Sequence, residues 1–128
     1  MSDKTISGPE LKTTLTGLGL TPKWFAGRLN ISMRTVVRWF DQEEIPEYAA
    51  RELEQVHSLT RTEMGNVLSG WGATGAVLTF RRDCDITPKH ELPNEYAVPA
   101  SWHRALTFRV VEHLRSNGKE NITVGYWD

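Results

Sequence analysis

The fold is decided by the stretch LTPKWFAGRLNISMRTVVRWF, which occupies residues 20–40. Thr21 is a good helix-capping residue, and Pro22 suits the first helical turn, where a missing N–H costs nothing. A second capping residue, Ser32, follows eleven positions after Thr21. The stretch therefore predicts two short helices joined by a tight turn, the first over residues 22–29 and the second ending with the stretch.

Apolar and small residues in this stretch stand at the offsets that a helix-turn-helix requires. Ala26 is small at the point where the two helices approach each other. The positions that must face the core hold large apolar side chains, namely Phe25, Leu29, Ile31, Val36 and Trp39. In a helix-turn-helix the second helix enters the major groove of DNA, so this helix is the predicted reading element.

The face of the second helix opposite Val36 and Trp39 is predicted to contact DNA. Arg34 and Arg38 are four residues apart and project side by side, and arginine pairs bidentately with guanine. Hydroxyl groups on this face can donate to phosphate, apolar side chains can touch a thymine methyl group, and basic residues of the preceding helix can hold the DNA backbone. The predicted DNA-binding residues are Lys23, Arg28, Ser32, Met33, Arg34, Thr35, Val37 and Arg38. Two alternatives stay open: a packing role for Met33, and an ion pair with a carboxylate for Arg28.

Over residues 22–41 the chain resembles the helix-turn-helix of the lambda-repressor-like (Cro-type) regulators. The residues that carry the resemblance are Ala26, Ile31, Val36, Trp39 and the run RTVVRW from Arg34. Asn30 stands where that family usually has glycine, and Pro22 stands where it often has glutamine. Asparagine tolerates a left-handed turn, so the tight turn is still expected. The resemblance implies a sequence-specific DNA-binding regulator of phage or bacterial type.

Positive charge is concentrated in the same segment. The chain carries 15 Lys and Arg against 16 Asp and Glu, which gives a formal net charge of −1. Residues 22–40 nevertheless contain Lys23, Arg28, Arg34 and Arg38 and no acidic residue. Because binding to nucleic acid depends on basic groups that neutralise phosphates, this local excess favours a DNA-binding role for the segment.

Length and composition predict a small globular protein of the cytoplasm. The 128 residues allow one compact domain or two small lobes. Cys84 is the only cysteine, so an internal disulfide is impossible, and the first residues lack the pattern of a signal peptide. No apolar run approaches the ~20 residues that a membrane-spanning helix needs, so no membrane partner is expected.

Two further helices complete the predicted N-terminal domain, residues 1–69. Ser7 and Glu10 form a capping-box pattern ahead of Leu11, Leu15 and Leu18, which recur on one helical face. A second apolar repeat begins at residue 46 and is read either as one helix to about residue 69 or as two. The glycine-rich run over residues 70–75 is predicted to be a loop that ends this domain.

The predicted C-terminal domain, residues 76–128, is a strand-helix-strand unit. Its elements are a strand over 76–82, an amphipathic helix over 101–115 and a strand over 122–127, with a connecting loop between the first strand and the helix. Two strands are marginal by themselves, which predicts that a second copy completes the sheet. The expected fold class is therefore mainly α with a small α+β C-terminal part: a helix-turn-helix bundle followed by a dimerisation unit.

This order of domains is similar to one branch of the anti-CRISPR-associated (Aca) regulators. Such families repress their own operon by occupying a promoter, so the resemblance implies an autoregulatory repressor. The expected partners are operator DNA with two half-sites and a second copy of the chain. Two other functions are open: an antitoxin or similar module whose C-terminal lobe binds a different protein, and a DNA-binding accessory protein of phage packaging or recombination.

Enzymatic and metal-dependent functions are not expected. Asp83, Cys84, Asp85 and His90 are residue types that bind metals, but a single cysteine without a paired motif is weak support for a site. No motif orders a nucleophile with a base, and the glycine-rich run lacks the ending of a phosphate-binding loop. His103 and His113 are expected at the surface of their helix. The sequence therefore predicts a protein that is not an enzyme and uses no cofactor or metal.

Overall fold

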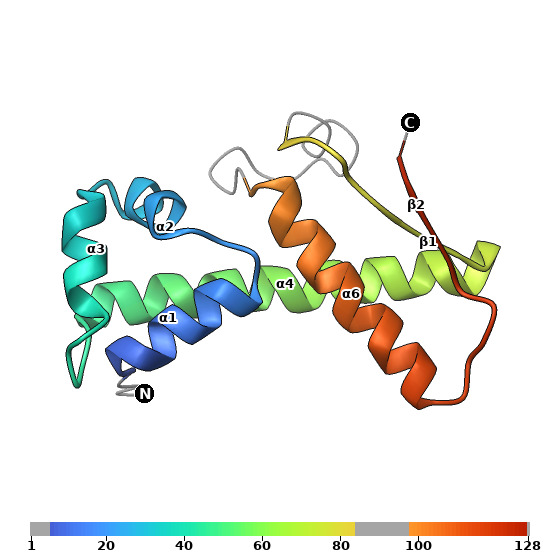
Figure 1. Cartoon of the computed structure of the whole chain (residues 1–128), viewed down its shortest axis with the longest axis horizontal. Helices are drawn as coiled ribbons and strands as arrows, with labels where there is room; N and C mark the ends of the chain where they lie inside the picture. Colours follow the sequence, from blue (N-terminus) through green and yellow to red (C-terminus); the bar gives the residue numbers. More distant parts are fainter. Residues whose placement is uncertain (1–5, 84–97, 128) are drawn as a thin grey trace. The chain divides into compact units, whose positions relative to one another are not determined.

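The structure is a computed structural model of the chain, and it describes residues 6–83 and 98–127. These residues form five helices and a two-stranded parallel sheet (Figure 1). In chain order the elements are α1 (Gly8–Gly17), α2 (Pro22–Leu29), α3 (Met33–Trp39), α4 (Glu47–Thr74), β1 (Ala76–Thr79), α6 (Ala100–Ser116) and β2 (Thr123–Tyr126). The predicted fold class, mainly α with a small α+β part near the C-terminus, is confirmed.

The chain forms two compact units, Met1–Leu59 and Thr60–Asp128. The first contains α1, α2, α3 and the first part of α4, and the second contains the rest of α4 with β1, α6 and β2. The sequence predicts a domain boundary at residues 70–75, whereas the contacts divide the chain within α4. The segment 46–69, open as one helix or two, forms a single helix from Glu47 onward.

The loop predicted for residues 70–75 is wrong, because α4 continues to Thr74. Each glycine costs a helix about 1 kcal/mol relative to alanine, but every added residue of a formed helix also gains a hydrogen bond. The Thr74 hydroxyl donates to the Gly70 carbonyl at 2.9 Å, and the Gly75 N–H donates to Trp71 O at 2.6 Å. Gly75 then takes a left-handed conformation, with φ of 78°, and ends the helix.

Side-chain caps begin the first three helices, as the sequence predicts. The hydroxyl oxygens of Ser7, Thr21 and Ser32 accept from the backbone N–H three residues later, at 3.1, 3.0 and 3.3 Å. Asn30 adopts the left-handed conformation between α2 and α3, with φ of 58° and ψ of 45°. The turn is therefore as tight as a helix-turn-helix needs, with asparagine in place of glycine.

The core of the first unit contains the apolar positions predicted for the helix-turn-helix. Phe25, Ala26, Val36 and Trp39 are buried, while Leu29 and Ile31, also predicted for the core, are half-buried. Around them lie buried residues of α1, of its flanking segments and of α4, namely Ile6, Leu11, Leu15, Leu18, Leu20, Ile45, Ala49, Ala50, Leu53 and Val56. Contacts from these elements fix the orientation of α3.

Gly8 joins the start of α1 to the end of α3. Its N–H donates to Gln42 O at 2.8 Å, and a Cβ at this position would lie 2.0 Å from Trp39 O and 2.5 Å from Phe40 C. The obstacle is backbone, which a rotamer change cannot remove.

We expect Gly8→Ala to lower the free energy of unfolding by about 1–3 kcal/mol, because the two segments must separate to admit the methyl group. Thermal denaturation measures the loss. Gly17→Ala is the matched control, since a Cβ at Gly17 meets nothing within 4 Å. Equal melting temperatures for Gly8→Ala and the unmodified protein would contradict this close approach.

In the second unit, α6 lies between the parallel strands β1 and β2 in sequence order. Ala76 pairs with Thr123 and Thr79 with Tyr126, so both strands are shorter than predicted, while α6 is one residue longer at each end than the predicted 101–115. Buried residues from β1, α6 and the segments beside them form the core: Val77, Phe80, Val98, Ala100, Trp102, Leu106, Val110, Val111 and Leu114. The Asp83 carboxylate accepts from Ala100 N at 2.8 Å and so satisfies one free amide at the start of α6.

Candidate nucleic-acid interface

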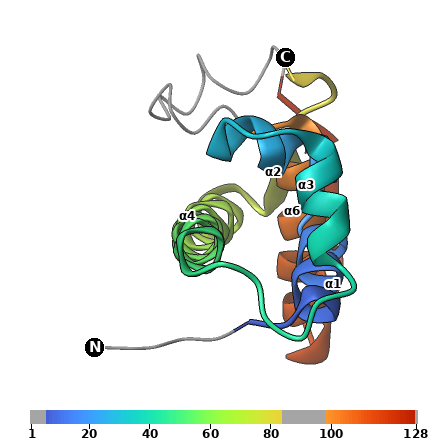
Figure 2. The same ribbon diagram turned by 90° about the vertical axis from the view of Figure 1, so that its left-hand side faces the viewer.

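Helix α3 is divided into a buried and an exposed face. Val36 and Trp39 are 0% and 5% exposed, whereas Met33 and Val37 are 51% and 45% exposed. Arg34 and Arg38 lie on the same exposed side. In the view of Figure 2, α3 lies in front, at the surface of its unit. Two of the largest exposed apolar side chains of the first unit thus stand beside two arginines on a single helix, as contacts with base edges would require.

Arg34 and Arg38 have their donors available for a ligand. Within residues 6–83 and 98–127, no ion pair or hydrogen bond holds either side chain. A guanidinium has five N–H donors, and two of them match the acceptor pair on the major-groove edge of guanine. These arginines are therefore the strongest candidates for direct contacts with DNA.

Of the two hydroxyl hydrogens of Ser32 and Thr35, only one is available to donate to a bound ligand. The Ser32 oxygen accepts from Thr35 N as the cap of α3, and the two hydroxyl oxygens lie 3.0 Å apart. One hydroxyl donates to the other, which leaves the second hydroxyl hydrogen for a phosphate oxygen. The cap and the predicted DNA contact are compatible for this reason.

The two basic residues predicted on α2 have different surroundings. Lys23 is exposed. Arg28 instead forms an ion pair with Glu52 of α4 at 2.5 Å, with only 15% of its side chain exposed, and its guanidinium lies 5.8 Å from the Trp24 ring centroid. The alternative left open for Arg28, an ion pair with a carboxylate, is the one observed. Arg28 is thus the least accessible of the predicted DNA-binding basic residues, and its evident contribution is to hold α2 on α4.

Acidic residues limit the surface at the C-terminal end of α3. Asp41, Glu43 and Glu44 follow the helix directly and are all exposed. Phosphates approaching that end would meet carboxylates, while the N-terminal end of α3 and the start of α2 present Lys23 and Arg34 without acidic neighbours in sequence. A DNA backbone is therefore expected to cross the N-terminal side of α3.

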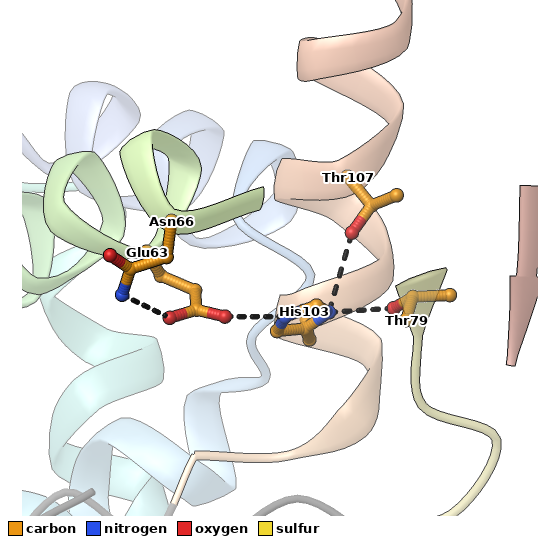
Figure 3. A network of polar contacts seen from close by, with 5 residues as sticks. All are labelled: Glu63, Asn66, Thr79, His103 and Thr107. Carbon is orange, nitrogen blue, oxygen red and sulfur yellow. Dashed lines mark hydrogen bonds and ion pairs between the residues drawn. The ribbon is translucent and has the colours of Figure 1, made fainter. Parts of the chain in front are cut away.

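A second polar cluster lies inside the other unit and is centred on His103 (Figure 3). The His103 Nε2 atom lies 2.7 Å from Glu63 Oε2, and its Nδ1 atom lies 2.7 Å from the Thr79 hydroxyl and 3.3 Å from that of Thr107. Asn66 Nδ2 donates to the other Glu63 oxygen at 3.1 Å. The network joins α4, β1 and α6.

The surface position predicted for His103 is wrong, because this residue is fully buried, whereas His113 is exposed as predicted. The order of hydroxyl, imidazole and carboxylate resembles that of a nucleophile with its base. However, His103, Glu63 and Thr79 are 0%, 1% and 5% exposed, so the cluster is shielded from solvent. The cluster is consequently a structural network that satisfies buried polar groups.

Of the four residues considered as metal ligands, only Asp83 lies in the described part of the chain. Cys84, Asp85 and His90 lie outside the described residues, and Asp83 caps α6. Among the described residues, no three histidine, cysteine or acidic side chains gather closely enough to hold a metal ion. No helix formed by the described residues has both the length and the apolar character that crossing a membrane requires.

No protein-family model matches the sequence, and no curated protein matches it. The candidate interface is accordingly defined by its own geometry: a tight turn at Asn30, a buried face of α3 and an exposed face with two arginines that have no partner in the described part of the chain.

Proposed function

We propose that the protein is a sequence-specific DNA-binding repressor that reads an inverted-repeat operator as a homodimer. The observation that carries the proposal is the division of α3, since Val36 and Trp39 anchor the helix while Arg34 and Arg38 extend from its other face without partners among the described residues. A helix held in this way after a tight turn suits the major groove.

The proposed contacts divide by chemistry. Arg34 and Arg38 read guanine, while Met33 and Val37 contact thymine methyl groups. Lys23 and the remaining hydroxyl donor of the Ser32 and Thr35 pair hold phosphates and set the register. A base-contacting set of this size discriminates among sequences, since each bidentate pair is worth about 1–3 kcal/mol against a wrong base.

Repression follows from occupancy alone, which needs no catalytic group, cofactor or metal. We place the protein in the cytoplasm, as a phage or bacterial regulator of its own promoter. This part of the proposal is supported by the resemblance of residues 22–41 to lambda-repressor-like regulators. A promoter footprint upstream of the reading frame tests it, and protection of no site there would contradict autoregulation.

A second candidate keeps the DNA-binding head and assigns the C-terminal unit to a different protein. It is favoured by apolar side chains on that unit, because Phe108, Val124 and Tyr126 are 64%, 52% and 43% exposed. An apolar surface of this kind fits a foreign partner as well as a second copy. A stoichiometric second protein co-purifying with the full chain would favour this candidate over the homodimer.

Arg34→Ala and Arg38→Ala test the reading face directly. Each substitution should weaken binding to an operator selected from random duplexes by about 1–3 kcal/mol and relax the preference at one base pair, because a bidentate contact is lost. Gel shifts with single-base operator variants measure both effects.

Arg51→Ala is the control for these variants, since Arg51 is an exposed arginine of the same unit that pairs with Glu47 on α4. It should bind like the unmodified protein. If the double variant of Arg34 and Arg38 binds the selected operator with unchanged affinity, α3 is not the reading helix. A uniform loss across all sequences would show that the arginines hold phosphates instead.

A further inference from the structure

Strand β2 is unusually exposed for a strand of a parallel sheet. Parallel sheets are normally covered on both faces. Within the described residues, however, β2 pairs only with β1, and three of its four residues are exposed. Its face and its outer edge each offer a different kind of contact.

The exposed face of β2 is apolar. In the observed register Val124 lies beside Val77 and Tyr126 beside Thr79, so these four side chains share one face of the sheet. Helix α6 covers the β1 half of this face, leaving Val77 and Thr79 at 0% and 5% exposure, whereas Val124 and Tyr126 are 52% and 43% exposed. The Arg81 guanidinium lies 4.7 Å from the centroid of the Tyr126 ring and covers part of it.

Phe108 of α6 borders the uncovered half of the sheet and is 64% exposed. Between this flank of α6 and β2 lies a groove of about 370 Å³, whose lining includes Phe108, Val111, Val124 and Tyr126 and also two basic residues, Arg104 and Arg115. We refer to Phe108, Val124 and Tyr126 as the apolar strip.

The outer edge of β2 carries hydrogen-bonding groups with a known direction. Trp127 N donates to Thr79 O across the sheet, which directs the Trp127 peptide toward β1. Successive residues of a strand turn their peptide groups to opposite edges, so the N–H and C=O groups of Val124 and Tyr126 point away from β1. An edge of this kind is a template for pairing with another strand.

We propose that β2 pairs in antiparallel fashion with β2 of a second copy, about a two-fold axis at Gly125. The pairing joins the two sheets into one of four strands, in the order β1-β2-β2-β1, and brings the two apolar strips together. The inference builds on the homodimer of the proposed function and names its contact surface. It requires nothing of the DNA-binding face.

The sequence of β2 suits pairing with itself. With the axis at Gly125, Val124 lies opposite the partner's Tyr126 and exchanges both backbone hydrogen bonds with it. The strand Thr-Val-Gly-Tyr carries no charge, so self-pairing sets no like charges opposite each other. Gly125 lies opposite Gly125 of the second copy. The two form a non-hydrogen-bonded pair, in which the Cα atoms are about 4.5 Å apart.

The size of the contact predicts a dimer of moderate strength. The apolar strip offers roughly 300 Å² per copy, given that an aromatic side chain buries 150–250 Å² when fully covered. A standard interface buries about 800 Å² per partner, so the strip and the strand backbone together lie at the lower end of that class. We therefore expect a dimer in the micromolar range of protein concentration.

A designed disulfide tests the register. In a Cys84→Ser background, Gly125→Cys should form a covalent dimer on mild oxidation, because the Cα separation at the axis falls within the disulfide range of about 4.4–6.8 Å. A Cβ at Gly125 meets only Leu78 Cδ2, at 3.5 Å, so the cysteine fits the fold. Thr123→Cys is the control, since two such residues would lie four positions, about 13 Å, apart and should stay unlinked.

Sedimentation velocity without DNA tests the strip. Phe108→Ser should raise the dissociation constant of the dimer at least tenfold, while Leu68→Ser, a control at another exposed apolar residue of the same unit, should leave it unchanged. A protein that stays monomeric to about 100 µM, well above the expected range, overturns the proposal. Equal linking of the two cysteine variants overturns the register. Since no DNA is present, loss of operator binding by the Arg34 and Arg38 variants remains a separate result.

Discussion

Glu63→Ala is expected to lower the free energy of unfolding by about 3–5 kcal/mol, because it leaves His103 buried without the group that satisfies Nε2. The 2.7 Å contact between Glu63 and His103 joins α4 to α6, and the opposite ring nitrogen is held by Thr79 of β1. Asn66 also loses its acceptor. Chemical denaturation followed by far-UV circular dichroism measures the change, with the midpoint shifting at constant slope if unfolding stays two-state.

Two further variants show whether the stability lost in Glu63→Ala comes from the missing hydrogen bond to His103 or from the missing side-chain volume. Glu63→Gln keeps the shape and one acceptor oxygen, so it should lose less stability than Glu63→Ala. Glu112→Ala removes an exposed glutamate from α6, whose contact with Arg115 is 3.5 Å long, and should change stability by less than about 1 kcal/mol. If Glu63→Ala proves no more costly than Glu112→Ala, the buried network does not support this unit.

Trp39→Ala should cost about 3–5 kcal/mol and abolish DNA binding, because it removes the largest side chain that anchors α3. Trp39 is 5% exposed, and its ring meets that of Tyr48 edge to face with centroids 5.9 Å apart. The cavity would free α3 from α4 as well as destabilise the fold. Thermal melting and gel shifts on the selected operator measure the two consequences.

Trp127→Ala provides the comparison for Trp39→Ala, since Trp127 is 41% exposed and lies in the other unit. Its loss should cost less stability and leave binding to an operator half-site intact. A Trp39→Ala protein that melts normally would mean that the register assigned to α3 is wrong.

The helix-turn-helix was predictable because its signals are local. Thr21 and Ser32 each cap a helix with their own hydroxyl group, and the left-handed turn is made by a single residue, Asn30. Each of these choices depends on residues within three or four positions, which is the range that sequence patterns describe. The elements and their exposed face follow from the same range.

The remaining features depend on residues far apart in the chain, which periodicity does not relate. Arg28 looked available for DNA because nothing near it in sequence neutralises it, and its partner Glu52 lies 24 residues away. His103 looked like a surface residue because its acceptor, Glu63, lies 40 residues earlier on another helix. The glycines at 70–75 suggested a loop by composition, yet the hydrogen bonds of α4 carry the helix through all but the last of them.

The pairing of β1 with β2 also affects the order in which the two units fold during synthesis. Ala76 meets Thr123 only after the whole intervening segment, α6 included, has been synthesised, so the sheet is a long-range contact with a costly loop to close. The first unit also has contacts between distant residues, such as the hydrogen bond from Gly8 to Gln42, but all of its residues precede Thr60. A nascent chain would therefore complete α3 and the rest of the first unit before its sheet. During that interval the apolar residues of β1 and α6 lack their final cover, so we expect this half of the protein to be the more prone to aggregate during synthesis.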